Sequence, residues 1–559
     1  MYWRDVYNNW LSSNIFDEET KIELSKLTDE KEIEDRFYKN LEFGTGGLRG
    51  VMGAGTNRMN KYTVGRATKG LGNYLINNYP DKKNTVVIAY DTRLNSDNFA
   101  HTAADVLTGM GIEVYIFDKP VPTPVLSFAV KYFKGVAGIV VTASHNPKEY
   151  NGYKVYDEYG CQLVPKDAKA VIGYVDEITD YESVSFKGND DLKKYIDITE
   201  EFVDAVMEQS RINVAESDLR IVYTPLHGTG NIPVRRVLER DGFKNVTIVA
   251  EQELPDGNFP TVKSPNPEEK TALSMGIELA KETDADIVLG TDPDCDRVGV
   301  GVKTKDGYRL FTGNQTGALL MDFLIRHTDL DKCRKPAVVK TIVTSELGAE
   351  IAREKGLTIF QTLTGFKFIG EKITQFEAAE KSGNTERNYD YLFGYEESYG
   401  YLAGTHARDK DAVVSSMLIC EMAAECKNQG ITLLDKLNEI YAKFGYYHDA
   451  LDSFTLQGKD GAERISEIMK ELRNSNGFLA DVDEVIDYSE SVAAETGFGE
   501  LPRSNVLKYI MQDGSWIAVR PSGTEPKIKI YYSIKGKDPE DAECKFENYR
   551  RVLVNKMGL

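Results

Sequence analysis

The sequence has few cysteines, no long apolar run and fewer basic than acidic residues. Its six cysteines, at positions 161, 295, 333, 420, 426 and 544, include no Cys-x-x-Cys pair, which favours reduced thiols over disulfides or a zinc site. No run of about 18 apolar residues predicts a membrane-spanning helix, and residues 1–5 lead into a charged helical pattern rather than a signal peptide. The formal net charge of −20 disfavours nucleic acid or an anionic membrane as the main partner. We therefore expect a cytoplasmic protein.

The chain is longer than one hydrophobic core usually serves. With 559 residues, 41% of them hydrophobic and 28% charged, it is typical of a globular protein of several domains. Residues 1 to 40 have helical spacing, and a plan of apolar strand, polar loop and amphipathic helix then recurs, which predicts successive α/β domains. The expected strands are 85–90, 138–141, 219–223, 285–289 and 391–393.

The last hundred residues follow a different pattern. Two expected strands, 515–519 and 528–532, flank a short loop, which indicates an antiparallel sheet and a smaller α+β domain. We place domain boundaries near residues 205, 315 and 445. The expected domains are 1–205, 206–315, 316–445 and 446–559.

A polar loop, Thr142-Ala143-Ser144-His145-Asn146-Pro147, directly follows the apolar run 138–141. Loops after buried strands are where α/β proteins bind ligands. A serine hydroxyl needs a base or a cation beside it to act as a nucleophile, and His145 is its neighbour in sequence. Lys154 follows in Asn-Gly-Tyr-Lys. The alternative is a turn that only caps the strand.

Three aspartates alternate after the expected strand 285–289. In an extended loop the carboxylates of Asp292, Asp294 and Asp296 can face one point, which is unfavourable without a cation. Hard oxygen donors suit Mg²⁺. An EF-hand is excluded, because its glycine and glutamate positions hold Arg297 and Lys303. A solvated acidic turn is the alternative.

Two further segments suit phosphate. Residues 520–527 combine two cations with Ser522, Gly523 and Thr524, whose hydroxyls and backbone amides can form an anion-binding nest; an ordinary hairpin is the alternative. The glycine-rich segment 43–50 carries Arg49, but it lacks the lysine and Ser/Thr ending of a P-loop.

Glu396 and Ser398, after another expected strand, suit hydrogen bonding to hydroxyls, although the signal is weak alone. Together a serine, an acidic metal site, a phosphate nest and a hydroxyl-binding loop are what phosphoryl transfer on a sugar phosphate needs.

These four loops resemble, in sequence and order, the motifs of the α-D-phosphohexomutase superfamily, which holds phosphoglucomutases and phosphomannomutases. The resemblance runs from Phe43 to Lys527. It implies four domains around a central cleft, the first three α/β with similar mixed sheets. It also implies that Ser144 is a phosphoserine and that Asp292, Asp294 and Asp296 bind Mg²⁺ together with its oxygen.

The resemblance implies roles for further residues. Lys154 matches a proposed general acid or base, and Arg49 and Arg297 match active-site arginines. The expected catalytic residues are Ser144, Lys154, Arg49, His145 and Lys410. The expected substrate-binding residues are Arg297, Thr364, Gly365, Lys367, Glu396, Ser398, Lys410, Arg520, Ser522, Gly523 and Thr524.

Two positions depart from the family pattern. Many relatives have glycine where this chain has Tyr395, and phosphomannomutase-like members often have histidine where it has Gly400. Residues 406–410 and 364–368 instead resemble segments of glucose enzymes. We expect interconversion of glucose 1-phosphate and glucose 6-phosphate, primed by glucose 1,6-bisphosphate, with mannose and pentose phosphates as alternatives. A metal-assisted phosphatase and a non-catalytic phosphosugar sensor are alternatives of other classes.

Overall fold

The computed structural model describes residues 2–44, 46–80, 84–456, 458–475, 477–494, 498–522 and 527–559. The chain forms two compact units, one of residues 1–310 with 400–424 and one of residues 311–399 with 425–559. Within the described ranges, no helix has both the length and the apolar character needed to cross a membrane. None of the six cysteines, which all lie in these ranges, forms a disulfide.

The first unit begins with the expected helical lead. Its helices are α1 Tyr2–Ser12, α2 Glu18–Ser25 and α3 Glu30–Phe37. Trp10 stacks on Phe16 with ring centroids 4.1 Å apart, and Phe37 meets Trp10 edge to face. These helices therefore have a small aromatic core of their own.

The first sheet has six strands in the order β1-β5-β4-β2-β3-β6. β2 pairs in parallel with β3 and β4, and β5 runs antiparallel to β4. β2 and β4 are buried along their whole length, as continuous apolar runs predict for central parallel strands. The strands are β1 Gly47–Val51, β2 Thr85–Tyr90, β3 Glu113–Phe117, β4 Ala137–Val141, β5 Tyr150–Tyr156 and β6 Lys193–Ile196. The helical elements here are α4 Lys61–Asn78, α5 Ser96–Gly109, α6 Thr123–Phe133, α7 Pro165–Asp176, η1 Tyr181–Ser183, η2 Asp190–Leu192 and α8 Thr199–Met207.

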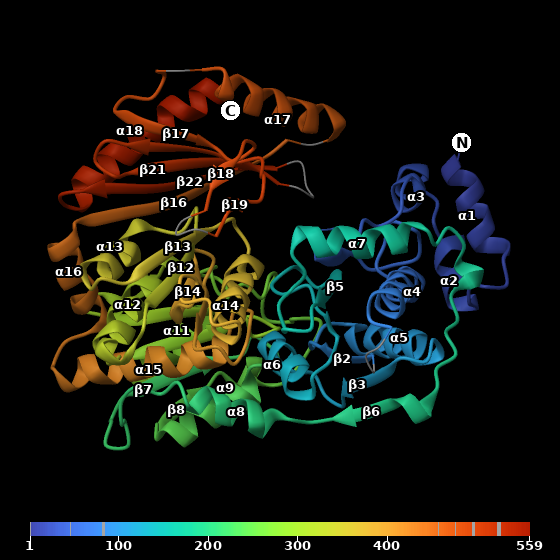
Figure 1. The fold of residues 1–559 in the computed structure, drawn as a ribbon, viewed down its shortest axis with the longest axis horizontal. Helices are drawn as coiled ribbons and strands as arrows, with labels where there is room; N and C mark the ends of the chain where they lie inside the picture. The colour runs from blue at the N-terminus through green and yellow to red at the C-terminus, as the bar shows by residue number, and fades with distance from the viewer. Residues whose placement is uncertain are drawn as a thin grey trace. The chain divides into compact units, whose positions relative to one another are not determined.

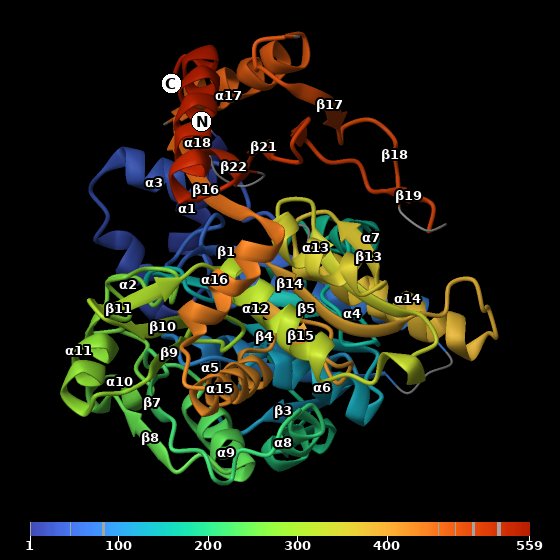
Figure 2. The same ribbon diagram turned by 90° about the vertical axis from the view of Figure 1, so that its left-hand side faces the viewer.

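The second sheet repeats this plan. Its five strands follow the order β11-β10-β9-β7-β8, which Figure 2 shows as a series. β7 is parallel to β8 and β9, and β10 is antiparallel to β9. The strands are β7 Arg220–Thr224, β8 Asn245–Ile248, β9 Ile287–Thr291, β10 Val298–Thr304 and β11 Gly307–Phe311, and the helices are α9 Asn231–Asp241, α10 Ala250–Glu253 and α11 Ser274–Thr283. The segment 400–424 adds β15 Gly400–Ala403 and most of α15 Ala412–Asn428.

The second unit contains another α/β sheet, in which β12 is parallel to both β13 and β14. The strands are β12 Pro336–Thr341, β13 Thr358–Thr362 and β14 Asp390–Glu396. The helical elements are α12 Gly313–Arg326, η3 Leu330–Lys332, α13 Glu346–Glu354, α14 Phe366–Lys381 and α16 Leu433–Phe444.

The C-terminal part has a five-stranded sheet in the order β16-β22-β21-β20-β17, and each neighbouring pair is antiparallel. Helices α17 and α18 pack on it, as Figure 1 shows in orange and red. The elements are β16 Tyr446–Thr455, α17 Gly458–Arg473, β17 Val482–Asp487, β18 Val492–Ala493, β19 Glu500–Leu501, β20 Leu507–Met511, β21 Trp516–Pro521, β22 Lys527–Gly536 and α18 Pro539–Met557. The prediction of α/β sheets followed by a smaller α+β domain is confirmed.

The three α/β sheets place their sequence motifs at equivalent points. Each motif follows the carboxyl end of the third parallel strand: the Ser144 loop follows β4, the aspartate loop follows β9 and the Glu396 loop closes β14. Carboxyl ends of parallel strands are where such sheets bind ligands. The motifs are therefore related by topology, although the sequence shows no repeat.

Candidate active site

The Ser144 loop leaves β4 in a backbone conformation that few residues adopt. Ser144 has φ 51°, in the left-handed region, and its N–H donates to the hydroxyl of Thr142 at 2.8 Å. Its Oγ donates to Oδ2 of Asp292 at 2.6 Å and lies 3.2 Å from Nδ1 of His145. Ser144 is only 4% exposed. The loop therefore directs one buried hydroxyl at one carboxylate.

Arg93 holds this loop, and its role was not predicted from the sequence. Its guanidinium donates to the carbonyl oxygens of Ser144 at 2.6 Å, Pro147 at 3.0 Å and Tyr150 at 3.1 Å, and also to that of Asn146. The guanidinium group of arginine has five N–H donors in one plane, so it can bind several carbonyl oxygens at once. The signal available in the sequence was the Asp-Thr-Arg run at the end of β2, a strand adjacent to β4.

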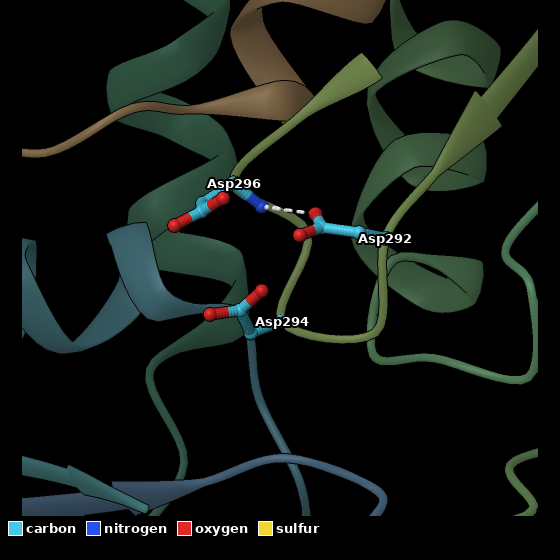
Figure 3. A group of neighbouring side chains, drawn as sticks. All are labelled: Asp292, Asp294 and Asp296. Carbon is cyan, nitrogen blue, oxygen red and sulfur yellow. Dashed lines mark hydrogen bonds between the residues drawn. The ribbon is translucent and has the colours of Figure 1, made fainter. Parts of the chain in front are cut away.

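The aspartate loop is organised by its own backbone. Oδ1 of Asp292 accepts the N–H groups of Asp296 at 3.0 Å and Arg297 at 2.9 Å, and Cys295 turns the chain with φ 51°. Figure 3 shows the carboxylates of Asp292, Asp294 and Asp296 facing a common point. One oxygen of each lies within 4.8 Å of the others, and all three residues are buried. We call these residues the aspartate trio.

The aspartate trio fits a metal ion. Burial and repulsion from its neighbours raise the pKa of Asp292 well above its usual range, and burial and Asp294 also raise the pKa of Asp296. Oδ1 of Asp294 and Oδ1 of Asp296 are buried without a hydrogen-bond partner in the described part of the chain. Buried carboxylate oxygens without a hydrogen-bond donor in the protein are costly, and a divalent cation would satisfy both.

Two lysines border the aspartate trio. Nζ of Lys154, on β5, lies 3.1 Å from Oδ2 of Asp294 and 3.8 Å from Oδ2 of Asp296. Nζ of Lys410 lies 2.9 Å from Oδ2 of Asp296 and 3.1 Å from Oδ1 of Asp409. Burial acts against ionisation of Asp294, but Lys154 and Lys410 lower its pKa below the usual value. The site therefore holds two cations that can contact a phosphoryl group or move a proton.

Asp409 and Tyr156 extend this network and were not predicted. The hydroxyl of Tyr156 donates to Oδ2 of Asp409 at 2.6 Å, while Oδ1 of Asp409 faces Lys410. A Cβ at position 400 would lie 2.1 Å from Cδ of Lys410, so any residue other than Gly400 would displace the Lys410 side chain. The departure from histidine at position 400 is thus explained by space that the Lys410 side chain occupies.

The other predicted groups of the first unit have different partners. Arg297 pairs with Glu268 at 2.6 Å, and Arg49 is exposed on β1 opposite Gly152. Burial and the guanidiniums of Arg297 and Arg49 lower the pKa of His145 well below its usual value, so its imidazole is neutral at pH 7. His145 therefore contributes a neutral imidazole beside Ser144 and not a cation.

The predicted sugar-binding residues lie in the second unit. Glu396 is 5% exposed at the end of β14, and its Oε1 accepts the N–H of Gly365 at 2.8 Å. The hydroxyl of Thr364 is buried without a hydrogen-bond partner among the described residues. Lys367 lies in the first turn of α14, and Ser398 lies in the turn after β14. The structure therefore joins two segments that were separate in the sequence.

Tyr395, the second departure from the family pattern, is buried beneath this loop. Cβ atoms at Gly317 and Gly348 would lie 2.3 and 2.4 Å from atoms of the Tyr395 side chain. These two glycines therefore provide the volume that the tyrosine fills.

The predicted phosphate loop lies between β21 and β22. In the register of these two strands Arg520 lies opposite Lys529. The N–H of Ser522 donates to the carbonyl oxygen of Lys527 at 2.8 Å. Gly523 and Thr524 lie outside the described residues. The antiparallel hairpin expected around this loop is present.

Comparisons with known proteins agree with this arrangement. Models of the "Phosphoglucomutase/phosphomannomutase" α/β/α domains I, II and III match residues 40–182, 200–307 and 312–444, and the model of the C-terminal domain matches residues 459–548.

Two curated relatives are similar over most of the chain. A phosphoglucomutase of Staphylococcus haemolyticus (strain JCSC1435) is 37% identical over 532 residues, which cover 92% of this chain and 94% of the relative. A phosphoglucomutase of Staphylococcus aureus (strain MRSA252) is 38% identical over 535 residues, with the same coverage. The solved structure of a putative phosphomannomutase from Thermus thermophilus is 24% identical, with a TM-score of 0.68 over 92% of this chain and 99% of that one, which is a likeness of fold.

Proposed function

Because the chain belongs to the phosphoglucomutase/phosphomannomutase family, we propose that it interconverts glucose 1-phosphate and glucose 6-phosphate, with Ser144 as the residue that carries the phosphoryl group. The observation that supports this most is the buried contact between Ser144 Oγ and Asp292, 2.6 Å long, at the edge of the aspartate trio. A hydroxyl beside a candidate cation site is what phosphoryl transfer through a serine requires.

Asp292, Asp294 and Asp296 would hold Mg²⁺, together with an oxygen on Ser144. The fit rests on the two carboxylate oxygens without hydrogen-bond partners and on the raised pKa values of Asp292 and Asp296. When bound, the cation would neutralise charge that develops on the phosphoryl oxygens.

The residues of the first unit would act in two half-reactions. A free sugar hydroxyl attacks the phosphorus of phospho-Ser144, the bond from phosphorus to Oγ breaks, and glucose 1,6-bisphosphate forms. After the bisphosphate reorients, Oγ attacks the phosphorus of the other phosphoryl group, the bond from that phosphorus to the sugar oxygen breaks, and the second sugar monophosphate is released. In its neutral amine form Lys154 would accept the hydroxyl proton in the first step and return it in the second; its Nζ lies 3.1 Å from Oδ2 of Asp294. Lys410, Arg297 and Arg49 would contact phosphoryl oxygens.

The second unit would hold the sugar and the phosphate that does not react. Glu396, Ser398 and Thr364 would bind sugar hydroxyls, helped by Gly365 and Lys367. Arg520, Ser522, Gly523 and Thr524 would bind the other phosphate. The joining of Glu396 to Gly365 and the buried hydroxyl of Thr364 support the first assignment. We retain the domains 1–205, 206–315, 316–445 and 446–559 as part of this proposal.

The test is to supply glucose 1-phosphate with Mg²⁺ and a trace of glucose 1,6-bisphosphate, and to measure both glucose 6-phosphate and free phosphate. Glucose 6-phosphate without phosphate release supports the mutase. Phosphate release indicates a phosphatase, and neither product indicates a sensor. Parallel reactions with mannose 1-phosphate and ribose 1-phosphate decide among the sugars, and the highest kcat/KM is expected for glucose.

Glu396→Gln is expected to lower kcat/KM for glucose 1-phosphate roughly 10- to 100-fold, because a charged acceptor for hydroxyls becomes a neutral one, at a cost of about 1–3 kcal/mol. Glutamine keeps the size of the side chain and an oxygen for the Gly365 N–H. The measurement is steady-state kinetics. Glu380→Gln, at an exposed position in the last turn of α14, is the control and should behave as wild type does. An unchanged kcat/KM in Glu396→Gln would show that this loop does not bind the sugar.

A further inference from the structure

We propose that Thr123 is a positioning residue for Asp294, so that its hydroxyl determines how tightly the aspartate trio binds a divalent cation. Thr123 is the first residue of α6 and belongs to no sequence motif. Its backbone N–H donates to the carbonyl oxygen of Asp294 at 2.9 Å, and its Oγ1 donates to Oδ2 of Asp294 at 3.1 Å. Both residues are fully buried. This inference depends on the metal role given to the aspartate trio above.

The start of α6 supplies the backbone donor. The first N–H groups of a helix have no acceptor within the helix. Pro124 has no N–H, and the N–H of Val125 bonds to the carbonyl of Pro122 at 3.0 Å. The N–H of Thr123 is therefore directed out of the helix to the aspartate loop. The positive end of the helix dipole also favours a carboxylate at this place.

The hydroxyl selects which oxygen of Asp294 remains for a cation. Oδ2 of Asp294 accepts from Thr123 Oγ1 at 3.1 Å and from Lys154 Nζ at 3.1 Å. Oδ1 is buried and has no hydrogen-bond partner in the part of the chain that the structure describes. Two donors on one oxygen fix the rotation of the carboxylate, and one oxygen of Asp294 lies within 4.8 Å of an oxygen of each of the other two aspartates. Groups that orient metal ligands in this way commonly change metal affinity 10- to 100-fold when they are removed.

The other members of the aspartate trio are held differently. Asp292 accepts two N–H groups of its own loop, and Asp296 faces Lys410. Asp294 thus depends on a donor from α6, which lies about 170 residues earlier in the chain. The backbone hydrogen bond of Thr123 already joins α6 to the aspartate loop, and it remains when the hydroxyl is removed. Loss of the hydroxyl therefore changes the orientation of the Asp294 carboxylate more than the attachment of the loop.

Thr123→Val removes the hydroxyl and keeps the branched shape and the backbone N–H. Mn²⁺ binding is measured by calorimetry and by electron paramagnetic resonance on the full chain, freed of metal, for wild type, Thr123→Val and Thr123→Ser. We expect Kd for Mn²⁺ to rise roughly 10- to 100-fold in Thr123→Val and to stay within about threefold of wild type in Thr123→Ser. Thr102→Val, at a hydroxyl that bonds within its own helix, is the control and should bind as wild type does.

If Thr123→Val does not fold, Thr123→Ser and Thr123→Ala are compared instead. These two variants differ only in one oxygen atom. Loss of Mn²⁺ affinity in the alanine but not the serine variant, with similar melting temperatures of the metal-free proteins, supports the proposal. Wild-type affinity in Thr123→Val or Thr123→Ala overturns it while the metal site stands. Absence of Mn²⁺ binding in wild type overturns the metal site itself, and this proposal with it.

Discussion

Ser144→Ala should lower kcat for glucose 1-phosphate by roughly 10⁴-fold or more, because the proposed mechanism needs the Oγ of Ser144 to carry the phosphoryl group between half-reactions. Ser144 Oγ is buried, donates to Asp292 at 2.6 Å and lies beside a neutral imidazole. Alanine removes only the Oγ atom and keeps the Cβ atom at this turn. The primary measurement is formation of glucose 6-phosphate with saturating Mg²⁺ and added glucose 1,6-bisphosphate.

Mass spectrometry gives an independent result for the same variant. Wild-type protein exposed to glucose 1,6-bisphosphate is expected to gain one phosphoryl group, which peptide mapping should place on Ser144. Ser144→Ala should gain none, and Ser12→Ala, at an exposed position in α1, should behave as wild type does. Retained turnover in Ser144→Ala, or a wild type that never carries a phosphoryl group, would contradict the mutase mechanism.

Asp294→Asn is expected to lower turnover at least about 10³-fold and to weaken Mg²⁺ binding, because it removes one of three negative charges that meet at the cation site. Asparagine retains an oxygen that can accept from Thr123 or Lys154. The change in charge is therefore separated from a change in packing, and a similar melting temperature is expected for the metal-free variant.

Metal removal from the wild type tests the same site without a mutation. Excess chelator should abolish turnover, and added Mg²⁺ should restore it in the wild type but only weakly in Asp294→Asn. Asp306→Asn, at an exposed turn between β10 and β11, is the control and should respond as wild type does. Full activity in excess chelator would refute the metal assignment.

Two positions depart from the family pattern. Gly400 replaces the histidine of phosphomannomutase-like members, and Tyr395 replaces the glycine of many relatives. In the structure each has a packing reason: Gly400 makes room for Lys410, and Tyr395 fills space left by Gly317 and Gly348. The residues at these two positions are therefore weaker indicators of the preferred sugar than the motif comparison alone indicates. The assays with three sugar phosphates test that preference directly.

Local patterns in the sequence determined the elements and the chemistry of single loops. The apolar runs before Ser144 and Asp292 became β4 and β9, and the expected hairpin around residues 520–527 became β21 and β22. The turn of the aspartate loop is also local, because Asp292 accepts the N–H groups of Asp296 and Arg297 in the same six-residue segment. Such features could be predicted because neighbouring residues alone produce them.

Only the tertiary structure decided which distant groups meet. Ser144 and Asp292 are 148 residues apart, and Thr123 and Asp294 are 171 apart. Arg93 reaches four carbonyls of a loop more than 50 residues away. The first two contacts join the Ser144 loop and the start of α6, which belong to the first sheet, to the loop after β9 of the second sheet. They therefore follow from how these two sheets pack within the first unit. The spacing of residues within a motif does not predict these contacts, because the fold, and not the neighbouring residues, determines which groups meet.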